Sequence, residues 1–212
     1  LQGLNPAQHD AVIHRNGPLL VVAGAGSGKT RVLTHRIAHL IQEDNVNPFQ
    51  ILAITFTNKA AQEMKDRVAA LVGPVAEKMW VSTFHSACVR ILRRDAEQLG
   101  YPSTFSIYDQ ADAVRLTGYV ARDLGLDTKK FVPRSVHAHI SNLKNELVST
   151  HQALEKAEGV FDRKIAEIYE EYQRRLRTSG AMDFDDLLNV TVELFTAHPD
   201  TLTHYQERFQ HV

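Results

Sequence analysis

The sequence predicts an α/β fold in which a doubly wound, parallel sheet carries an inserted all-α subdomain. Three short apolar runs, at residues 19–23, 51–56 and 79–84, have the length and continuity of strands that are covered on both faces. A helical pattern follows each run, and this alternation is typical of βαβ units. After residue 107 the alternation stops, and no further strand is evident up to residue 178.

Each predicted strand is followed by apolar residues at the spacing of an amphipathic helix. Such helices bury one face against a sheet, which is what a covered parallel sheet requires. The apolar positions are, in chain order, Val32, Leu33, Ile37, Leu40 and Ile41, then Ala60, Met64, Val68 and Leu71, then Cys88, Val89, Ile91 and Leu92.

The stretch from 108 to 178 predicts helices alone. Asp109 is a good N-cap for a first helix, which Gly125 ends. Pro133 can open a second helix, because proline is well suited to the first helical position. A third helical pattern runs from about residue 160 to residue 177.

The last part of the chain predicts two more helices, at residues 183–195 and 201–209. The predicted organisation has three parts. Residues 1–107 form the first part of an α/β domain, 108–178 form the helical insertion, and 179–212 return to the α/β domain.

The composition disfavours several classes of protein. The chain has 212 residues, of which 43% are hydrophobic, so a sizeable core is available. No apolar run approaches the roughly 18 residues of a membrane span, and the polar N-terminal residues do not resemble a secretory signal. The single cysteine, Cys88, cannot form an internal disulfide and fits a reducing compartment. We therefore expect a cytoplasmic protein without a membrane partner.

The charge is distributed unevenly along the chain. The formal net charge is −1, which argues against a uniformly basic surface. Residues 1–107 carry 11 Lys and Arg against 8 Asp and Glu, residues 108–178 carry 12 against 11, and residues 179–212 carry 1 against 6. Any contact with a polyanion would therefore use a local groove rather than the field of the whole protein.

The segment AGAGSGKT at residues 23–30 has the spacing of a phosphate-binding loop, with alanine at the place of the first glycine. Glycines let the backbone wrap closely and point N–H groups at phosphate oxygens. A lysine in this pattern reaches the β- and γ-phosphates, and a threonine hydroxyl serves Mg²⁺. The predicted nucleotide-binding residues are Ala23, Gly24, Ala25, Gly26, Ser27, Gly28, Lys29 and Thr30. Of these, Lys29 and Thr30 are predicted to be catalytic, and Thr30 is predicted to bind Mg²⁺.

Four further segments accompany this loop. Gln8 lies just upstream, where its amide could read an adenine edge, although a lone glutamine is more often a surface residue. The segments at 54–68 and 81–93 place polar and aromatic residues where two predicted strands end, which is the edge where open α/β sheets bind ligands. The fourth segment, MDFDDLL, occupies residues 182–188.

Together these five segments resemble the superfamily 1 DNA helicases of the UvrD/Rep/PcrA type, in motif order and approximate spacing over nearly the whole chain. The resemblance implies an N-terminal RecA-like lobe with a helical insertion. It also implies an ATP- and Mg²⁺-dependent translocase that moves 3′→5′ on single-stranded DNA and unwinds duplexes at single-strand/duplex junctions. Such proteins serve DNA repair and replication in the bacterial cytoplasm at the nucleoid, with repair proteins as further partners.

The resemblance also implies roles for single residues. Gln8 matches the adenine-reading glutamine, and Arg31 matches a residue that packs on the adenine. Residues at the two strand ends and one aromatic in MDFDDLL match DNA contacts, and aromatic faces suit a translocase because every base has a π-face. The implied DNA-binding residues are Phe56, Thr57, Asn58, Thr83, Phe84, His85 and Phe184.

The residues also allow plainer interpretations. Phe84 could instead close the core, and His85 could serve the backbone. The carboxylates of Asp183, Asp185 and Asp186 could suggest a metal site, but they fit a capping face at a helix start better. A cluster of Arg90, Arg93 and Arg94 fits a phosphate path or a solvated helix face equally well.

One expected part of an ATPase is missing from this sequence. No apolar strand ends in the carboxylate that would hold Mg²⁺, and the family's acidic strand follows a segment like the one at which this chain stops. We therefore expect an N-terminal fragment that is nearly inactive alone, without the arginine finger of a second lobe. Two alternatives stay open, namely a helicase subunit of a helicase–nuclease complex and a non-catalytic nucleotide- or DNA-binding lobe. A P-loop kinase is disfavoured, because it has no use for the strand-end segments.

Overall fold

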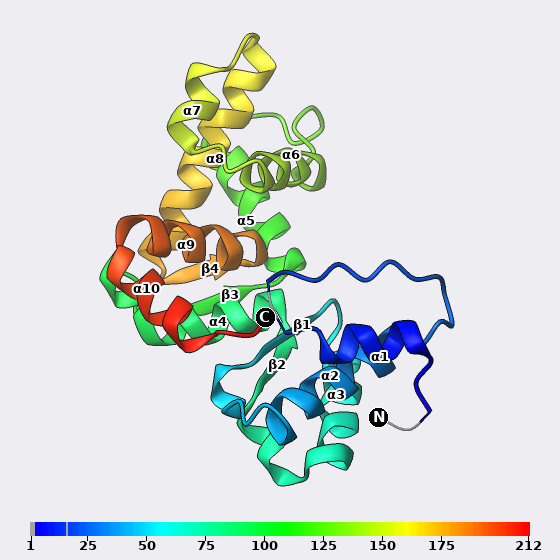
Figure 1. Cartoon of the computed structure of the whole chain (residues 1–212). Coiled ribbons are helices and arrows are strands. Elements are labelled where there is room, and N and C mark those ends of the chain that lie inside the picture. The colour runs from blue at the N-terminus through cyan, green and yellow to red at the C-terminus, as the bar shows by residue number, and fades with distance from the viewer. Residues whose placement is uncertain (1–2, 16) are drawn as a thin grey trace. The chain divides into compact units, whose positions relative to one another are not determined.

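The computed structural model describes residues 3–15 and 17–212 and divides into two compact units. The first unit is discontinuous in sequence and comprises Leu1–Ala87 and Thr203–Val212. The second unit is the continuous stretch Cys88–Leu202 (Figure 1). Helix α4 (Phe84–Asp95) and helix α10 (Pro199–Arg208) each contribute residues to both units.

The first unit contains a small parallel sheet covered by helices. Strand β1 (Leu52–Thr55) pairs with strand β2 (Trp80–Thr83) in a register that places Thr55 opposite Thr83. Helices α1 (Pro6–Ile13), α2 (Lys29–Gln42) and α3 (Asn58–Val72) belong to the same unit, with 3₁₀ turns η1 (Pro48–Gln50) and η2 (Pro74–Lys78) between them. Its buried core is formed by Ile37, Leu40, Ile51, Ala53, Met64, Val68, Ala76 and Met79.

A capping box fixes the start of helix α1, and an arginine of helix α2 holds its end. Asn5 and Gln8 form a capping box, in which each side chain accepts a hydrogen bond from the other residue's backbone N–H. At the other end, Arg36 of α2 donates to the carbonyls of Ala11 and His14, at 3.0 and 2.6 Å. The guanidinium thereby binds carbonyls at the end of α1, which have no partner within the helix.

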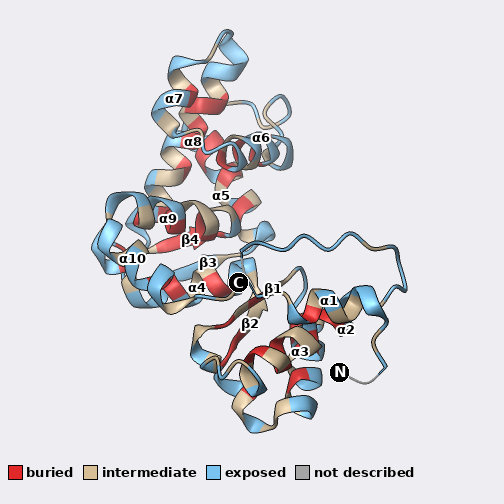
Figure 2. Ribbon diagram, viewed as in Figure 1, coloured by how far each residue is buried: buried red, intermediate tan, exposed pale blue. Residues whose placement is uncertain are grey.

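The second unit is mostly helical, with one small sheet. It contains η3 (Ala96–Leu99), β3 (Ser106–Tyr108), α5 (Gln110–Asp123), α6 (Pro133–Asn145), α7 (Thr150–Glu155), α8 (Val160–Thr178), β4 (Ala181–Asp183) and α9 (Phe184–Ala197). Strands β3 and β4 are parallel, with Tyr108 opposite Asp183. The core lies between α5, α6 and α8 and includes the fully buried Val120, Ile140 and Tyr172. Figure 2 colours the buried positions of these helices red.

Much of the predicted element pattern is confirmed. The runs at 51–56 and 79–84 are strands, and helices follow them. Asp109 caps α5 through a capping box with Asp112, and Pro133 stands in the first turn of α6. The short helix α7 and the strands β3 and β4 were not predicted. Each strand has only three residues, too few for an alternating pattern to show.

The prediction of a strand at residues 19–23 is wrong for this structure. Residues 18–24 have no strand pairing, and the side chains of Leu20 and Val22 are 86% and 88% exposed. Figure 1 shows this segment as a long extended connection before α2. A strand needs a hydrogen-bonded neighbour for its backbone groups, and within the described residues no strand lies against this segment. Propensity alone therefore does not make it a strand.

The helices of the described residues include none that could cross a membrane, because none combines sufficient length with sufficient apolar character.

Candidate functional site

The glycine-rich segment forms a loop that leads directly into helix α2. Gly28 caps the helix with a φ of 83°, and Gly26 has a φ of 74°, a left-handed backbone that glycine adopts without strain. A Cβ added at Gly24 or Gly26 would meet no atom within 4 Å, so the space in front of the loop is open. The residues present therefore fit a phosphate group, with the N-terminus of a 14-residue helix behind it.

Lys29 is folded back over this loop. Its Nζ donates to the carbonyl of Ala23 at 2.8 Å and to the carbonyl of Gly24 at 2.6 Å. Ser27 closes the turn by donating its hydroxyl to the carbonyl of Gly24 at 2.7 Å. The ammonium group is thus held at the loop by two exposed carbonyls, and a phosphate could take their place as its partner. Thr30 lies next to it in the first turn of α2, exposed.

Gln8 and Arg31 both lie beside the loop. Gln8 is distant from the loop in sequence, whereas Arg31 directly follows it. The side-chain amide of Gln8 donates to the carbonyl of Ser27 at 2.9 Å. A Cβ on Gly28 would lie 3.0 Å from the same amide nitrogen, and one on Gly3 would lie 2.7 Å from the Arg31 guanidinium. The structure therefore brings the predicted adenine-contacting pair beside the predicted phosphate loop, as the resemblance implies.

An apolar groove of about 710 Å³ begins at Lys29 and runs between α2 and β1. Val32, Ile37 and Leu40 line it from the helix, and Ile51 to Ile54 line it from the strand side. The backbone of Ile51 forms a parallel bridge with His211 at one side of this groove. Leu19 and Val21 of the segment that was predicted to be a strand lie at its margin.

The two predicted DNA-contacting segments lie at one edge of the first sheet. Because Thr55 is opposite Thr83, the residues that follow both strands emerge side by side. Thr57 caps α3 by accepting a hydrogen bond from the backbone N–H of Ala60 at 3.1 Å. Thr83 plays the same part for α4 by accepting from the N–H of Ser86 at 3.2 Å. These threonines therefore have a structural role whether or not they contact DNA.

Aromatic side chains stand exposed beside these caps. Phe56 is 93% exposed and Phe84 is 55% exposed, so the interpretation of Phe84 as a core residue is wrong. An aromatic ring that the fold leaves in water offers a stacking face to a ligand. His85 and Asn58 are exposed at the starts of their helices.

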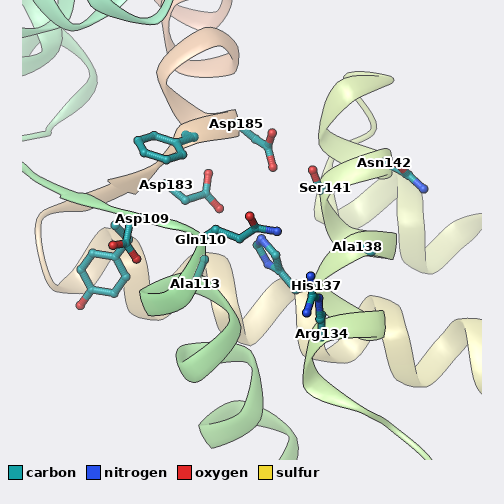
Figure 3. Close-up of a pocket in the computed structure, with 12 residues that line it drawn as sticks. Asp109, Gln110, Ala113, Arg134, His137, Ala138, Ser141, Asn142, Asp183 and Asp185 are labelled. Carbon is teal, nitrogen blue, oxygen red and sulfur yellow. The ribbon is translucent and has the colours of Figure 1, made fainter.

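Phe184, the predicted DNA contact of the second unit, begins helix α9 and is 48% exposed. It borders a pocket of about 310 Å³ between the starts of α5 and α9 and one face of α6. Figure 3 shows Gln110 and His137 lying between Asp183 and Arg134 in this pocket. The full lining is Tyr108, Asp109, Gln110, Ala113, Arg134, His137, Ala138, Ser141, Asn142, Asp183, Phe184 and Asp185.

The carboxylates around Phe184 form a capping box, as their sequence pattern predicted. Asp183 accepts from the backbone N–H of Asp186 at 2.8 Å, and Asp186 accepts from that of Asp183 at 3.1 Å. Sequence reasoning missed their third partner. Lys144 of α6, 1% exposed, donates to Asp183 at 2.7 Å and to Asp186 at 2.9 Å. We call Lys144, Asp183 and Asp186 the buried triad.

The buried triad is enclosed by further hydrogen bonds. Tyr172 of α8 donates to Asp183 at 2.7 Å, and Gln173 donates to Asp186 at 2.8 Å. Burial alone would lower the pKa of Lys144, but the adjacent Asp186 and Asp183 outweigh it and raise the pKa above its usual value. Lys144 is therefore charged at neutral pH. No sequence signal marked it, since a single lysine on a helix is usually solvated.

Burial has further effects on side chains near the triad. It raises the pKa of the Tyr172 hydroxyl, which the adjacent Asp183 raises further, so that Tyr172 stays a hydrogen-bond donor. It also lowers the pKa of His137, whose ring therefore stays neutral in the pocket at neutral pH. In the arginine cluster, Arg93 donates to the carbonyl of Ser103 at 3.0 Å and lies over the Phe105 ring, which is a structural role.

The comparisons with known proteins agree with this arrangement. Residues 4–212 match the family model described as the UvrD/REP helicase N-terminal domain. The chain is 56% identical over 216 aligned residues to the ATP-dependent DNA helicase UvrD1 of Mycobacterium tuberculosis, and 50% identical over 212 to the ATP-dependent DNA helicase PcrA of Bacillus subtilis. Each alignment covers 100% of this chain but only 28% and 29% of those relatives. The chain belongs to the UvrD/REP helicase family, as the sequence motifs indicated.

Proposed function

We propose that this chain is the nucleotide- and DNA-binding part of an ATP-dependent helicase that moves 3′→5′ on single-stranded DNA. One observation carries the proposal. The phosphate loop, the adenine-contacting pair Gln8 and Arg31, and the two strand-end segments are all present in one family member with the geometry described above. Single-stranded DNA, in particular at a junction with duplex, is the proposed substrate, in repair or replication in the bacterial cytoplasm at the nucleoid.

The proposed division of labour follows from the chemistry of the residues. Lys29 would leave the carbonyls of Ala23 and Gly24 and bind the β- and γ-phosphates of ATP. Thr30 would offer its hydroxyl to Mg²⁺, which supplies charge neutralisation between the phosphates when bound. The loop backbone from Ala23 to Gly28 would hold the phosphates through its N–H groups. Gln8 and Arg31 would contact the adenine.

DNA contacts are proposed at the exposed strand ends of the first unit and, separately, at the start of α9 in the second unit. Phe56, Phe84 and Phe184 offer π-faces, which bind bases without regard to sequence. Thr57, Asn58, Thr83 and His85 offer hydroxyl, amide and imidazole groups to phosphate oxygens. With a net charge of −1, such binding depends on these local contacts rather than on the charge of the whole chain.

A doubly wound, RecA-like sheet is part of the proposal. The groove between α2 and β1 is apolar, and its backbone edge at Ile51 already bonds a residue in parallel orientation. We propose that residues 19–23 become a strand once a neighbouring strand is available to pair with them. The division into a lobe at 1–107, a helical subdomain at 108–178 and a return at 179–212 remains part of the same proposal.

A specific observation favours a second candidate for the isolated chain, namely a lobe that binds without catalysis. In the described residues, β1 and β2 end in threonine, and the one strand that ends in a carboxylate is β4. That carboxylate, Asp183, is 2% exposed and already bonded to Lys144 and Tyr172, so it is not free to hold Mg²⁺. Membership in a helicase–nuclease complex is the other alternative.

Phosphate release from ATP tests these candidates. The 212-residue chain and the full-length protein are assayed side by side, with and without single-stranded DNA. We expect DNA-stimulated hydrolysis by the full-length protein and almost none by the chain, since an arginine finger alone contributes roughly 10³–10⁵ in rate. Hydrolysis by the chain at a comparable rate would show that one of its carboxylates acts in catalysis, contrary to this proposal. No hydrolysis by the full-length protein under any condition would refute the helicase.

A further inference from the structure

The buried triad lies directly behind Phe184. Asp183 is the N-cap of α9, Phe184 is the first helical residue, and Asp186 closes the capping box two residues later. The two carboxylates therefore fix the backbone on both sides of the exposed aromatic ring. Lys144, which bonds both carboxylates, comes from α6, 39 and 42 residues earlier in the chain. The direction in which Phe184 leaves the backbone thus depends on a residue of another helix.

Both carboxylates of this network accept a hydrogen bond at each oxygen. Each Asp183 oxygen has a donor, Oδ1 from the Asp186 N–H and Oδ2 from both Lys144 and Tyr172. For Asp186, Oδ1 accepts from Lys144 and Gln173, and Oδ2 accepts from the Asp183 N–H. Asn189 of α9 donates to the Lys144 carbonyl at 2.9 Å, which adds a second tie between α6 and α9. Buried carboxylates that are hydrogen-bonded at every oxygen favour one arrangement of the groups around them.

The charges make Lys144 the least replaceable member. The triad places two carboxylates, 2% and 3% exposed, around one ammonium group. Without the ammonium, two like charges would face each other at the start of one helix without water. Burial and the adjacent Asp183 already raise the pKa of Asp186. Water entry or rearrangement of the first turn of α9 would relieve such a pair, and either would move Phe184.

We propose that Lys144 is a positioning residue for DNA binding, which holds Phe184 in the orientation for stacking on a base. Helix α6 thereby controls an aromatic contact that it does not make itself. The inference rests on the proposed function, because it needs Phe184 to contact DNA. According to this inference, the Phe184 side chain is already ordered before DNA binds. Binding therefore does not lose the conformational entropy of that side chain.

A double-mutant cycle in the full-length protein tests this inference. Lys144→Met, Phe184→Ala and the double variant are compared with the unaltered protein for affinity to a fluorescent oligothymidylate without nucleotide. Phe184→Ala should weaken binding about 5- to 150-fold, the range for loss of one stacked base. Lys144→Met should cause most of that loss, and the double variant should bind no more weakly than Phe184→Ala, because contacts in one pathway are not additive.

Two readouts separate positioning from a loss of fold. An oligothymidylate that carries 2-aminopurine reports stacking by its fluorescence, and Lys144→Met should change that signal as Phe184→Ala does. Binding of a fluorescent ATP analogue in the absence of DNA should stay unchanged. Lys156→Met removes an exposed lysine of the same helical region and serves as the matched control, with no effect expected on either readout. If the Lys144→Met variant does not fold, the double variant K144M/D186N replaces it. The second substitution removes one of the two carboxylate charges that the loss of Lys144 leaves without a partner.

Each outcome is decisive. Equal DNA affinity of Phe184→Ala and the unaltered protein would refute the proposed DNA contact and the inference with it. A loss in Phe184→Ala with none in Lys144→Met would refute the inference alone. Losses that multiply in the double variant would show that Lys144 acts independently of Phe184. Failure of both Lys144 variants to fold would assign Lys144 to the stability of the unit and would also overturn the inference.

Discussion

The phosphate loop and the start of α9 are built in opposite ways. The loop is held mainly by neighbours in its own segment, such as the Ser27 hydroxyl on Gly24, with one longer-range bond from the Gln8 amide. Leu20 and Val22 before it are 86% and 88% exposed. The start of α9 is held by Lys144, 1% exposed and distant in sequence. One candidate site is therefore local and open, and the other is long-range and buried.

This difference explains which parts of the structure each site needs. A cradle made of backbone N–H groups needs only its own turn and the helix that follows, so it can form before the sheet around it is complete. A base-stacking face needs a fixed direction, and a capping box bonded to a buried cation provides one. Removal of the Lys29 ammonium group should therefore impair ATP hydrolysis at the phosphate loop. Removal of the Lys144 ammonium group should instead change the orientation of Phe184 at the start of α9.

The largest expected difference concerns backbone protection. In the 212-residue chain, amide hydrogens at residues 19–24 should exchange with solvent almost freely, since they lack ladder partners. The amides of Asp183 and Asp186, bonded inside the capping box, should exchange at least about 10³-fold more slowly, because exchange there requires the second unit to open. Hydrogen exchange read by NMR or mass spectrometry gives both rates. Equal exchange rates in the two segments would contradict the proposed difference between an open phosphate loop and a buried start of α9.

A second prediction separates chemistry from folding at Lys29. Lys29→Ala should lower DNA-stimulated ATP hydrolysis by the full-length protein at least about 10²- to 10³-fold, the loss expected for one charge-stabilising donor. The melting temperature should hardly move, because Lys29 bonds only two exposed carbonyls of its own loop. Phosphate release and thermal unfolding measure the two effects. A variant that hydrolyses ATP at an unaltered rate would exclude the proposed role of Lys29.

The smallest predicted effect concerns nucleotide choice. Gln8→Ala should weaken ATP binding a few-fold and narrow the preference for ATP over GTP, as expected for the loss of one neutral hydrogen bond of about 0.5–1.5 kcal/mol. Asn5→Ala is the matched control, because it breaks the same capping box while it leaves the Gln8 amide in place. Competition between the two nucleotides measures the preference. If both variants narrow it equally, the cap and not the amide selects the base.

The sequence predicted those elements of both units whose signals are local. The strands at β1 and β2, the N-caps at Asp109 and Asp183, and the phosphate loop all depend on residues within a few positions of one another. The failure at residues 19–23 has a physical reason: an apolar run predicts a strand only where a partner strand is present. In this chain the described residues supply none.

The second site could be predicted only in part. The capping carboxylates were found from the pattern MDFDDLL, because an N-cap and its helix are neighbours, whereas Phe184 was found through the family resemblance. Lys144 and Tyr172 were not, since nothing in the local sequence distinguishes a buried lysine from a solvated one. Their contact with Asp183 exists only once α6, α8 and α9 have packed together, which is a property of tertiary structure. The roles of all the predicted site residues in binding remain predictions.

The discontinuity of the first unit sets an order of events on the ribosome. The ring of Trp80 packs on Phe209 with centroids 4.9 Å apart, and the backbone N–H of Leu52 donates to the His211 carbonyl at 2.9 Å. These partners follow Leu202 in the chain, so Leu1–Ala87 must wait while the whole of Cys88–Leu202 is made. At roughly 5–20 residues per second, that delay is on the order of 10 seconds. The inserted unit can therefore fold first, and the nascent nucleotide-binding segment is an expected client of chaperones during the interval.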